Sequence, residues 1–257
     1  MVFESLTRAS GSGQRLSRKV LKSPDEFLSI LRKLFSRLVD EGRIAIFLAL
    51  GALVALAGIV SVIQYRKGEA KDAAEALYVA DSSARKVLEK FAPQAGPDGA
   101  APVAESAGPQ GPVDETFSDA IAKYKVVSEK YGSTFPGFQA RLRLGNLYYD
   151  HKEYAQAAQW FEQALDNAPA RMEKVFVLKN LGHAYENQSK FSDAISAYDK
   201  ALNLGDVGVK GELLLNQARS WMGAGDPEKA RAALERVTSE MSGTPYAQTA
   251  EELKRQL

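Results

Sequence analysis

The sequence predicts an all-α protein in which a single N-terminal transmembrane helix is followed by an α-solenoid of about 3.5 helical hairpins. Two observations predict this fold class. Residues 44–63 form one uncharged apolar run, and small and aromatic residues further along the chain recur at intervals of 36 to 37 positions. An apolar run of this length matches the thickness of a bilayer, whereas a repeat of this period matches one helical hairpin.

Composition limits the function classes before any element is placed. The 257 residues hold 33 Lys+Arg against 32 Asp+Glu, without the surplus of basic residues typical of nucleic-acid binding. Cysteine is absent, and the two histidines, His151 and His183, offer little material for a metal site or a catalytic triad. No phosphate-binding glycine loop or HExxH motif occurs. We therefore expect no enzymatic activity, catalytic residue, metal, cofactor or nucleic-acid partner.

Residues 1–43 form a basic segment, with nine Lys+Arg and five acidic residues. Ser23 and Glu26 make a capping-box pattern around Pro24, and apolar residues then recur at helical spacing. This pattern predicts an amphipathic helix over 24–39 that lies on anionic lipid headgroups or on the cytoplasmic surface of a partner, and its direct continuation into the apolar run favours the membrane.

Residues 44–63 are predicted to cross the membrane. Twenty residues at 1.5 Å each make a helix of about 30 Å, which is the thickness of the hydrocarbon core. The alternatives are a buried core helix, which is normally shorter or amphipathic, and a cleaved signal peptide, which has a shorter leading segment than 43 residues. Gly51, Ala55 and Gly58 share one face of the span, and small residues allow another helix to pack closely there.

The charge on either side of the span predicts its orientation. Residues 1–43 carry a net charge of +4, whereas residues 64–257 carry −3. Because basic segments are retained in the cytoplasm, the N-terminus is predicted to be cytoplasmic and the remainder to lie on the other side.

Two segments separate the span from the repeats. Residues 64–91 are rich in Ala, Glu and Lys and predict a helix, with Leu77 and Tyr78 among its apolar positions. Residues 92–112 contain five of the ten prolines and have too little apolar surface to pack, so we expect a tether.

Residues 113–257 contain the repeats. The first full set is Leu144, Gly145, Tyr148, Tyr154, Ala157, Phe161 and Ala164, and the same offsets give Leu181, Gly182, Tyr185, Phe191, Ala194, Tyr198 and Ala201. A looser third copy surrounds Ala218, and residues 117–127 match only the second half of the unit. Small residues allow the two helices of a hairpin to cross closely, while aromatic residues fill the space between hairpins. We expect hairpins at 138–171, 175–208 and 211–244 and a capping helix at 245–257.

These residues resemble the tetratricopeptide repeat, with Arg141 where that repeat usually has Trp and Asp206 where it has Pro. The resemblance implies that the first helix of each hairpin lines a concave face that binds proteins or peptides. By position, the groove candidates are Asn146, Tyr149, Phe176, Lys179, Asn180, His183, Glu186, Arg219 and Met222.

One known use of such a face is not expected. Repeats of this family that bind acidic chaperone C-termini have a carboxylate clamp of Lys, Asn and Arg. Asn146 and Asn180 match that clamp, but Leu142, Glu212 and Asn216 stand where its basic residues belong. Without these cations the charge-assisted contacts are missing.

The order of the segments also resembles the YfgM-type family, which are inner-membrane tetratricopeptide proteins and ancillary subunits of the bacterial SecYEG translocon. That resemblance implies a periplasmic scaffold anchored in the inner membrane, with the translocon, periplasmic chaperones and the lipid bilayer as partners. The alternative is an assembly or coordination factor for cell-envelope machinery such as division, peptidoglycan or outer-membrane complexes.

Overall fold

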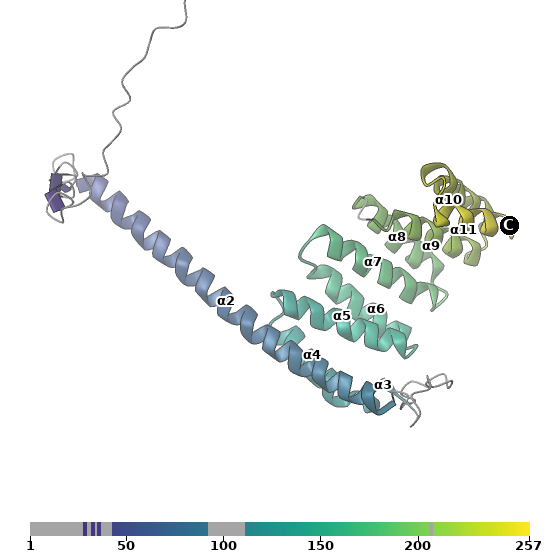
Figure 1. The fold of residues 1–257 in the computed structure, drawn as a ribbon, viewed down its shortest axis with the longest axis horizontal. Helices are drawn as coiled ribbons and strands as arrows, with labels where there is room; N and C mark the ends of the chain where they lie inside the picture. The colour runs from purple at the N-terminus through teal and green to yellow at the C-terminus, as the bar shows by residue number, and fades with distance from the viewer. Residues whose placement is uncertain (1–27, 30–31, 34, 37–42, 92–110, 206–207) are drawn as a thin grey trace, which may run out of the picture. The chain divides into compact units, whose positions relative to one another are not determined.

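The structure, a computed structural model, describes all residues except 1–27, 30–31, 34, 37–42, 92–110 and 206–207. Every regular element in the described ranges is a helix (Figure 1). The helices are α2 (Arg43–Phe91), α3 (Val113–Thr116), α4 (Ser118–Lys130), α5 (Phe135–Asp150), α6 (Tyr154–Asp166), α7 (Arg171–Glu186), α8 (Phe191–Asn203), α9 (Lys210–Gly223), α10 (Pro227–Glu240) and α11 (Pro245–Lys254). The predicted all-α fold class is confirmed. Most of the predicted tether, residues 92–110, lies outside the described residues.

The chain forms two compact units, Met1–Tyr65 and Arg66–Leu257. In the first, residues 28–29, 32–33 and 35–36 of the predicted amphipathic helix 24–39 are helical, and its other residues lie outside the described part. The long apolar helix is present as the first part of α2. By length and composition, one helix among the described residues, Ile46–Phe91, could cross a membrane, and its most apolar stretch is wholly unburied.

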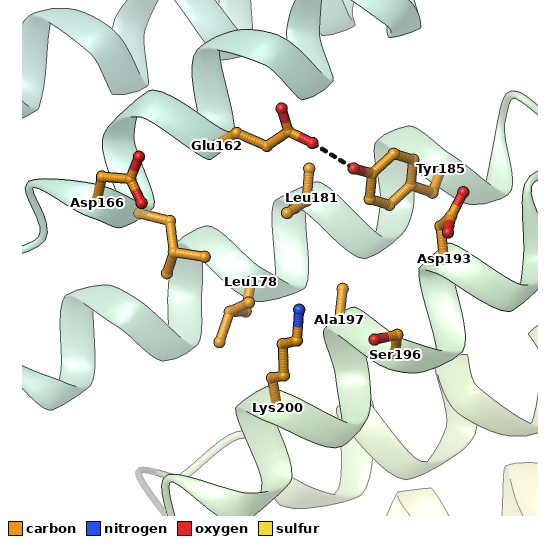
Figure 2. Close-up of a pocket in the computed structure, with 10 residues that line it drawn as sticks. Glu162, Asp166, Leu178, Leu181, Tyr185, Asp193, Ser196, Ala197 and Lys200 are labelled. Atoms are coloured by element: carbon orange, nitrogen blue, oxygen red, sulfur yellow. Dashed lines mark hydrogen bonds between the residues drawn. The ribbon is translucent and has the colours of Figure 1, made fainter.

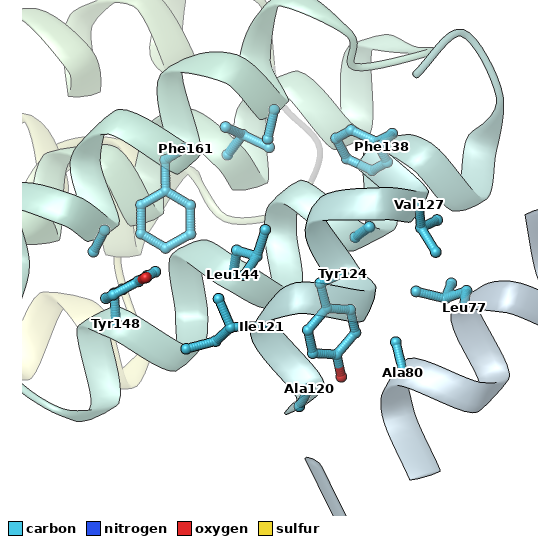
Figure 3. Close-up of a cluster of buried hydrophobic side chains, with 14 of the residues drawn as sticks. Leu77, Ala80, Ala120, Ile121, Tyr124, Val127, Phe138, Leu144, Tyr148 and Phe161 are labelled. Atoms are coloured by element: carbon cyan, nitrogen blue, oxygen red, sulfur yellow. The ribbon is translucent and has the colours of Figure 1, made fainter. Parts of the chain in front are cut away.

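The second unit begins with residues 66–91, which pack as part of the repeat region. Ala73, Leu77 and Ala80 of α2 are buried in the same apolar cluster as Tyr124 and Val127 of α4 (Figure 3). Alanine at two of these positions allows the helix backbone to lie close to the aromatic ring. The half-hairpin recognised at 117–127 therefore has a first helix, and it comes from before the predicted tether.

Polar contacts hold the same helix in place. The Tyr124 hydroxyl donates to the Asp81 carboxylate at 2.6 Å, and Arg143 of α5 pairs with that carboxylate at 3.4 Å. The Lys123 ammonium donates to the Ser83 hydroxyl at 2.7 Å. Residues 66–91 thus contact both α4 and α5.

The predicted close crossing of the two helices in a hairpin is confirmed. A Cβ atom built on Gly145 would lie 2.5 Å from the Phe161 ring, and one built on Gly182 would overlap the Tyr198 ring. Both rings are buried. Only glycine therefore leaves room for the aromatic ring at these two crossings.

Helix starts follow the capping residues. Asp226 accepts a hydrogen bond from the Lys229 backbone N–H at 3.1 Å, ahead of Pro227 in the first turn of α10. Thr134 and Thr244 cap α5 and α11 in the same way, and each precedes a proline in the first turn. A capping side chain followed by proline in the first turn thus marks the start of each of these three helices.

Arg141 has a structural role at its unusual repeat position. Its guanidinium donates to the backbone carbonyls of Ser128 at 2.6 Å, Gly132 at 3.1 Å and Gly137 at 3.2 Å. Two of these carbonyls lie at the end of α4 and in the turn that follows it, where no helical partner is available. The arginine thus fastens the end of α4 to the start of α5.

Candidate protein-binding surface

The first helices of three successive hairpins, α5, α7 and α9, are linked by polar side chains on one face. Between α5 and α7, the Asn180 amide donates to the Asn146 carbonyl oxygen at 3.4 Å. Between α7 and α9, Lys179 pairs with Glu212 at 3.1 Å. The structure therefore brings the predicted groove positions of neighbouring hairpins into contact with one another.

A pocket of about 220 Å³ opens on this face. Its lining residues are Asn146, Tyr149, Phe161, Asn180 and His183. Four of them were predicted from the sequence, and the fifth, Phe161, is the buried aromatic residue at the crossing of α5 and α6. An asparagine amide has two donor hydrogens and two acceptor lone pairs, and the single long bond between the two asparagines uses one of each. The pocket therefore combines an aromatic wall with amide groups that can bind a peptide backbone.

Glu186 lies deeper and joins three helices. Its carboxylate accepts hydrogen bonds from the Ser220 hydroxyl at 2.6 Å and the Tyr198 hydroxyl at 2.8 Å, and His183 Nδ1 lies 3.3 Å away. Burial acts to raise the pKa of Glu186, but hydrogen bonds from His183, Ser220 and Tyr198 outweigh it and hold that pKa below its usual value. The charged carboxylate of α7 thus links that helix to α8 and α9 through hydrogen bonds in the interior.

The Glu186 site also differs from a catalytic triad in its geometry. The Ser220 hydroxyl donates to the carboxylate, while His183 contacts Tyr198 and Asn216. A histidine base must receive the proton of the nucleophile, so this arrangement does not activate the serine.

The remaining predicted positions lie on α7 and α9, outside the lining of the pocket. Phe176 is 38% exposed, and the Lys179 ammonium stands 5.7 Å from the centre of its ring. Arg219 is exposed and donates to the Asn216 side chain at 3.1 Å, while Met222 is half-buried. These residues present an aromatic and a basic group to solvent.

The sequence did not identify the buried residues that hydrogen-bond to His183 and Glu186 beneath this surface. Asn216 is 3% exposed, and its amide lies 3.3 Å from His183 Nε2. Ser220 and Tyr198 are fully buried beside Glu186. The available signal was the spacing of 33 to 34 residues that places Asn216 opposite His183 and Ser220 opposite Glu186 on neighbouring first helices.

In the N-terminal unit, Gly51, Ala55 and Gly58 are exposed, and an added Cβ on either glycine would meet no atom within 4 Å. Their role in helix packing stays a prediction.

The architecture defined by these hairpins is an α-solenoid with a polar and aromatic face along its first helices. The family model described as tetratricopeptide repeat matches residues 115–171 and 179–243. The solenoid is therefore built of tetratricopeptide repeats, as the sequence pattern predicted.

Two curated relatives are similar to this chain. The human intraflagellar transport protein 88 homolog is 22% identical over 242 residues, which are 91% of this chain and 27% of that protein. Anaphase-promoting complex subunit 6 of Arabidopsis thaliana is 40% identical over 63 residues, which are 24% of this chain and 12% of that protein. The chain thus spans about a quarter or less of the length of these relatives.

A crystal structure of BtubC (BKLC) from P. vanneervenii is also similar. It is 16% identical, with a TM-score of 0.42, over 81% of this chain and 90% of that one.

Proposed function

We propose that this protein is a membrane-anchored scaffold whose repeats bind partner proteins through the face formed by α5, α7 and α9. The observation that carries the proposal is the pocket in which Asn146, Tyr149, Asn180 and His183 converge. Tetratricopeptide repeats indicate a protein-interaction scaffold. The pocket adds a position at which an extended segment would find both amide groups and an aromatic wall.

The anchor in this proposal is the apolar first part of α2. Its exposed apolar side chains include Phe47, Leu53 and Leu56, which are 71%, 66% and 65% exposed. Side chains of this kind are stable in contact with lipid, and a helix satisfies its own backbone hydrogen bonds there. The basic segment 1–43 favours a cytoplasmic N-terminus, with the repeats on the other side of the membrane. The resemblance to the YfgM-type family supports a bacterial inner membrane, with the repeats in the periplasm.

The proposed partners include the SecYEG translocon and periplasmic chaperones. This part of the proposal is supported by the order of basic segment, apolar span and repeats, which resembles the YfgM-type family. The two curated relatives are named for other assemblies, intraflagellar transport and the anaphase-promoting complex.

Topology is tested first. A reporter that is active only after export is fused behind Leu257 of the full chain, and a matched fusion carries a cytoplasmic reporter. We expect activity from the exported reporter alone. Activity confined to the cytoplasmic fusion would overturn the periplasmic placement while leaving the repeats as a binding surface.

Partners are tested by photocrosslinking from Tyr149, Lys179 and Gly58, with the exposed Glu235 of α10 as the control position. Translocon subunits crosslinked from Gly58, together with exported polypeptides or chaperones from Tyr149 and Lys179, are the expected result. Crosslinks from Tyr149 to division, peptidoglycan or outer-membrane proteins, with none to the translocon, would instead favour the role in envelope assembly. Equal yields from Glu235 and Tyr149 would refute the pocket as the binding site.

A further inference from the structure

A second hollow, shown in Figure 2, is lined by residues of α6, α7 and α8. Leu178, Leu181 and Tyr185 of α7 form its floor. At 100° per residue, these positions lie about 160° around the helix from Asn180 and His183. Its walls are α6 and α8, the second helices of two successive hairpins.

This hollow continues into a larger neighbour. The two have volumes of about 200 Å³ and about 560 Å³ and share Leu165, Asp166, Leu178 and Lys200 in their linings. Together they make one channel between α6 and α8, which we call the outer groove. On α7 it extends from Lys174 to Tyr185, a distance of about 16 Å at 1.5 Å per residue.

The base of the outer groove is apolar. Leu178 and Leu181 from α7 and Ala197 from α8 point into it (Figure 2), and Leu165 from α6 also lines it. Leu178 and Leu181 are only 3% and 6% exposed, so they lie at the bottom of the groove, between the residues of α6 and α8 that line it. Such a shape fits leucine-sized side chains that project from one face of a helix.

Charge is distributed unevenly along the outer groove. Glu162 and Asp193 stand at the end near Tyr185, whose hydroxyl donates to Glu162, whereas Lys174 stands at the other end. Asp166 and Lys200 line both hollows. Among the described residues, none of these three carboxylates and two ammonium groups takes part in an ion pair. The groove therefore has an acidic end and a basic end, and neither end is neutralised by an ion pair within the described residues.

We propose that the outer groove binds an amphipathic helix from a partner protein, as a second docking surface distinct from the α5, α7 and α9 face. The bound helix places leucine-like residues at every third or fourth position on the apolar floor. A basic residue at one end of it pairs with Glu162 and Asp193, and an acidic residue at the other end pairs with Lys174. About eleven helical residues cover the 16 Å length. With both surfaces occupied, the protein holds two partners at once.

The test uses a fluorescein-labelled peptide of about 14 residues, long enough to cover the groove as a helix. It carries two glutamates at its N-terminus, leucines on one face and two lysines at its C-terminus, because this order of charges also favours its own helix. A scrambled peptide of the same composition, with the leucines dispersed, is the control ligand. Fluorescence anisotropy is measured with the full chain in lipid nanodiscs.

We expect the amphipathic peptide to bind and the scrambled peptide not to bind. Asp193→Lys should weaken binding about tenfold by placing like charges together, whereas the matched charge reversal Glu235→Lys on α10 should leave it unchanged. A peptide with glutamates in place of its lysines should recover affinity for the Asp193→Lys variant. Equal binding of both peptides, failure of this exchange, or a loss caused by Arg219→Glu on the other face would each overturn the proposal.

A second copy of the chain is the competing occupant, and the absence of native cysteine makes it easy to detect. Ser196→Cys places a thiol in the outer groove, and Ser239→Cys places one on the exposed side of α10. Under mild oxidation, we expect both variants to remain largely monomeric, with the same small proportion of disulfide-linked dimer. A disulfide-linked dimer formed selectively through position 196 would show that the groove is a self-association surface, and would refute a partner helix.

Discussion

The crossing at Gly182 offers a sharp test of the packing, because replacement by alanine adds one methyl group directly against a buried aromatic ring. The added Cβ would lie 2.5 Å from Cζ and 2.8 Å from Cδ1 of Tyr198, and it would be closer still to Cε1. Ordinary contacts between such atoms are 3.4–4 Å. Tyr198 is fully buried, and its hydroxyl donates to the Glu186 carboxylate at 2.8 Å. A ring displaced by the methyl group must therefore strain this hydrogen bond as well.

The size of the effect follows from three terms. Overpacking costs about 1–3 kcal/mol, and weakening a hydrogen bond to a charged group adds up to about 1.5–3 kcal/mol. Replacing a glycine inside a helix by alanine returns about 0.5–1 kcal/mol. We expect Gly182→Ala to lower the free energy of unfolding by about 2–4 kcal/mol. Gly145→Ala should cost about 1–2 kcal/mol less, because the Phe161 ring opposite it has no hydrogen bond to lose.

The assay is urea unfolding of the full chain in detergent, followed by tryptophan fluorescence. Both tryptophans, Trp160 and Trp221, lie in the repeat region and report on it. Gly68→Ala is the matched control, because an added Cβ at this exposed helical glycine meets nothing within 4 Å. That control should be neutral or slightly stabilising. If Gly182→Ala were as stable as Gly68→Ala, the proposed crossing of α7 and α8 would be wrong.

Three further predictions concern single positions. Leu77→Ala should lower the free energy of unfolding by about 2–5 kcal/mol because Leu77 is buried. Tyr78→Ala should change it by less than about 0.5 kcal/mol because Tyr78 is exposed. Equal effects in urea unfolding would show that residues 66–91 are not part of the repeat core. Arg141→Ala should cost about 1–3 kcal/mol by leaving carbonyl groups unpaired, and Arg141→Lys should recover little of it because lysine lacks the planar fork; full rescue by lysine would contradict the three contacts. Because the pKa of Glu186 is lowered by folding, its charge contributes stability that is present above the usual value of 4.5 and is lost as pH falls through the lower folded value. Glu186→Gln should therefore flatten the loss of stability at acid pH, measured as urea midpoints, and an unchanged acid slope would argue against it.

Much of the fold follows from residues whose local chemistry determines where helices begin and where they cross. Gly145 and Gly182 could be placed at helix crossings because the aromatic residue at a constant offset requires a position without a side chain. Asp226 before Pro227 marks a helix start because the side chain caps the first turn and proline needs no hydrogen-bonding partner there. The role of residues 66–91 could not be found in this way, because alanines at 73 and 80 are equally typical of an exposed helix.

The candidate surface was predictable only in part. Helical periodicity was sufficient to put Asn146 and Asn180 on one face, because that spacing is a property of each hairpin. The same periodicity could not distinguish Glu186, whose carboxylate accepts hydrogen bonds from Tyr198 and Ser220, from Phe176, which is exposed. Both occupy positions of the same repeat, and their difference depends on what the neighbouring helix offers.

The sequence by itself determined the apolar span, the period of the hairpins and the starts of several helices, since each depends on residues close together in the chain. Only the tertiary structure decided which first helix completes the hairpin of α4, which face residues remain free, and where the outer groove lies. These features depend on contacts between residues far apart in the chain, such as Asp81 with Tyr124 and with Arg143. No local pattern encodes such contacts, because they form only when the hairpins stack.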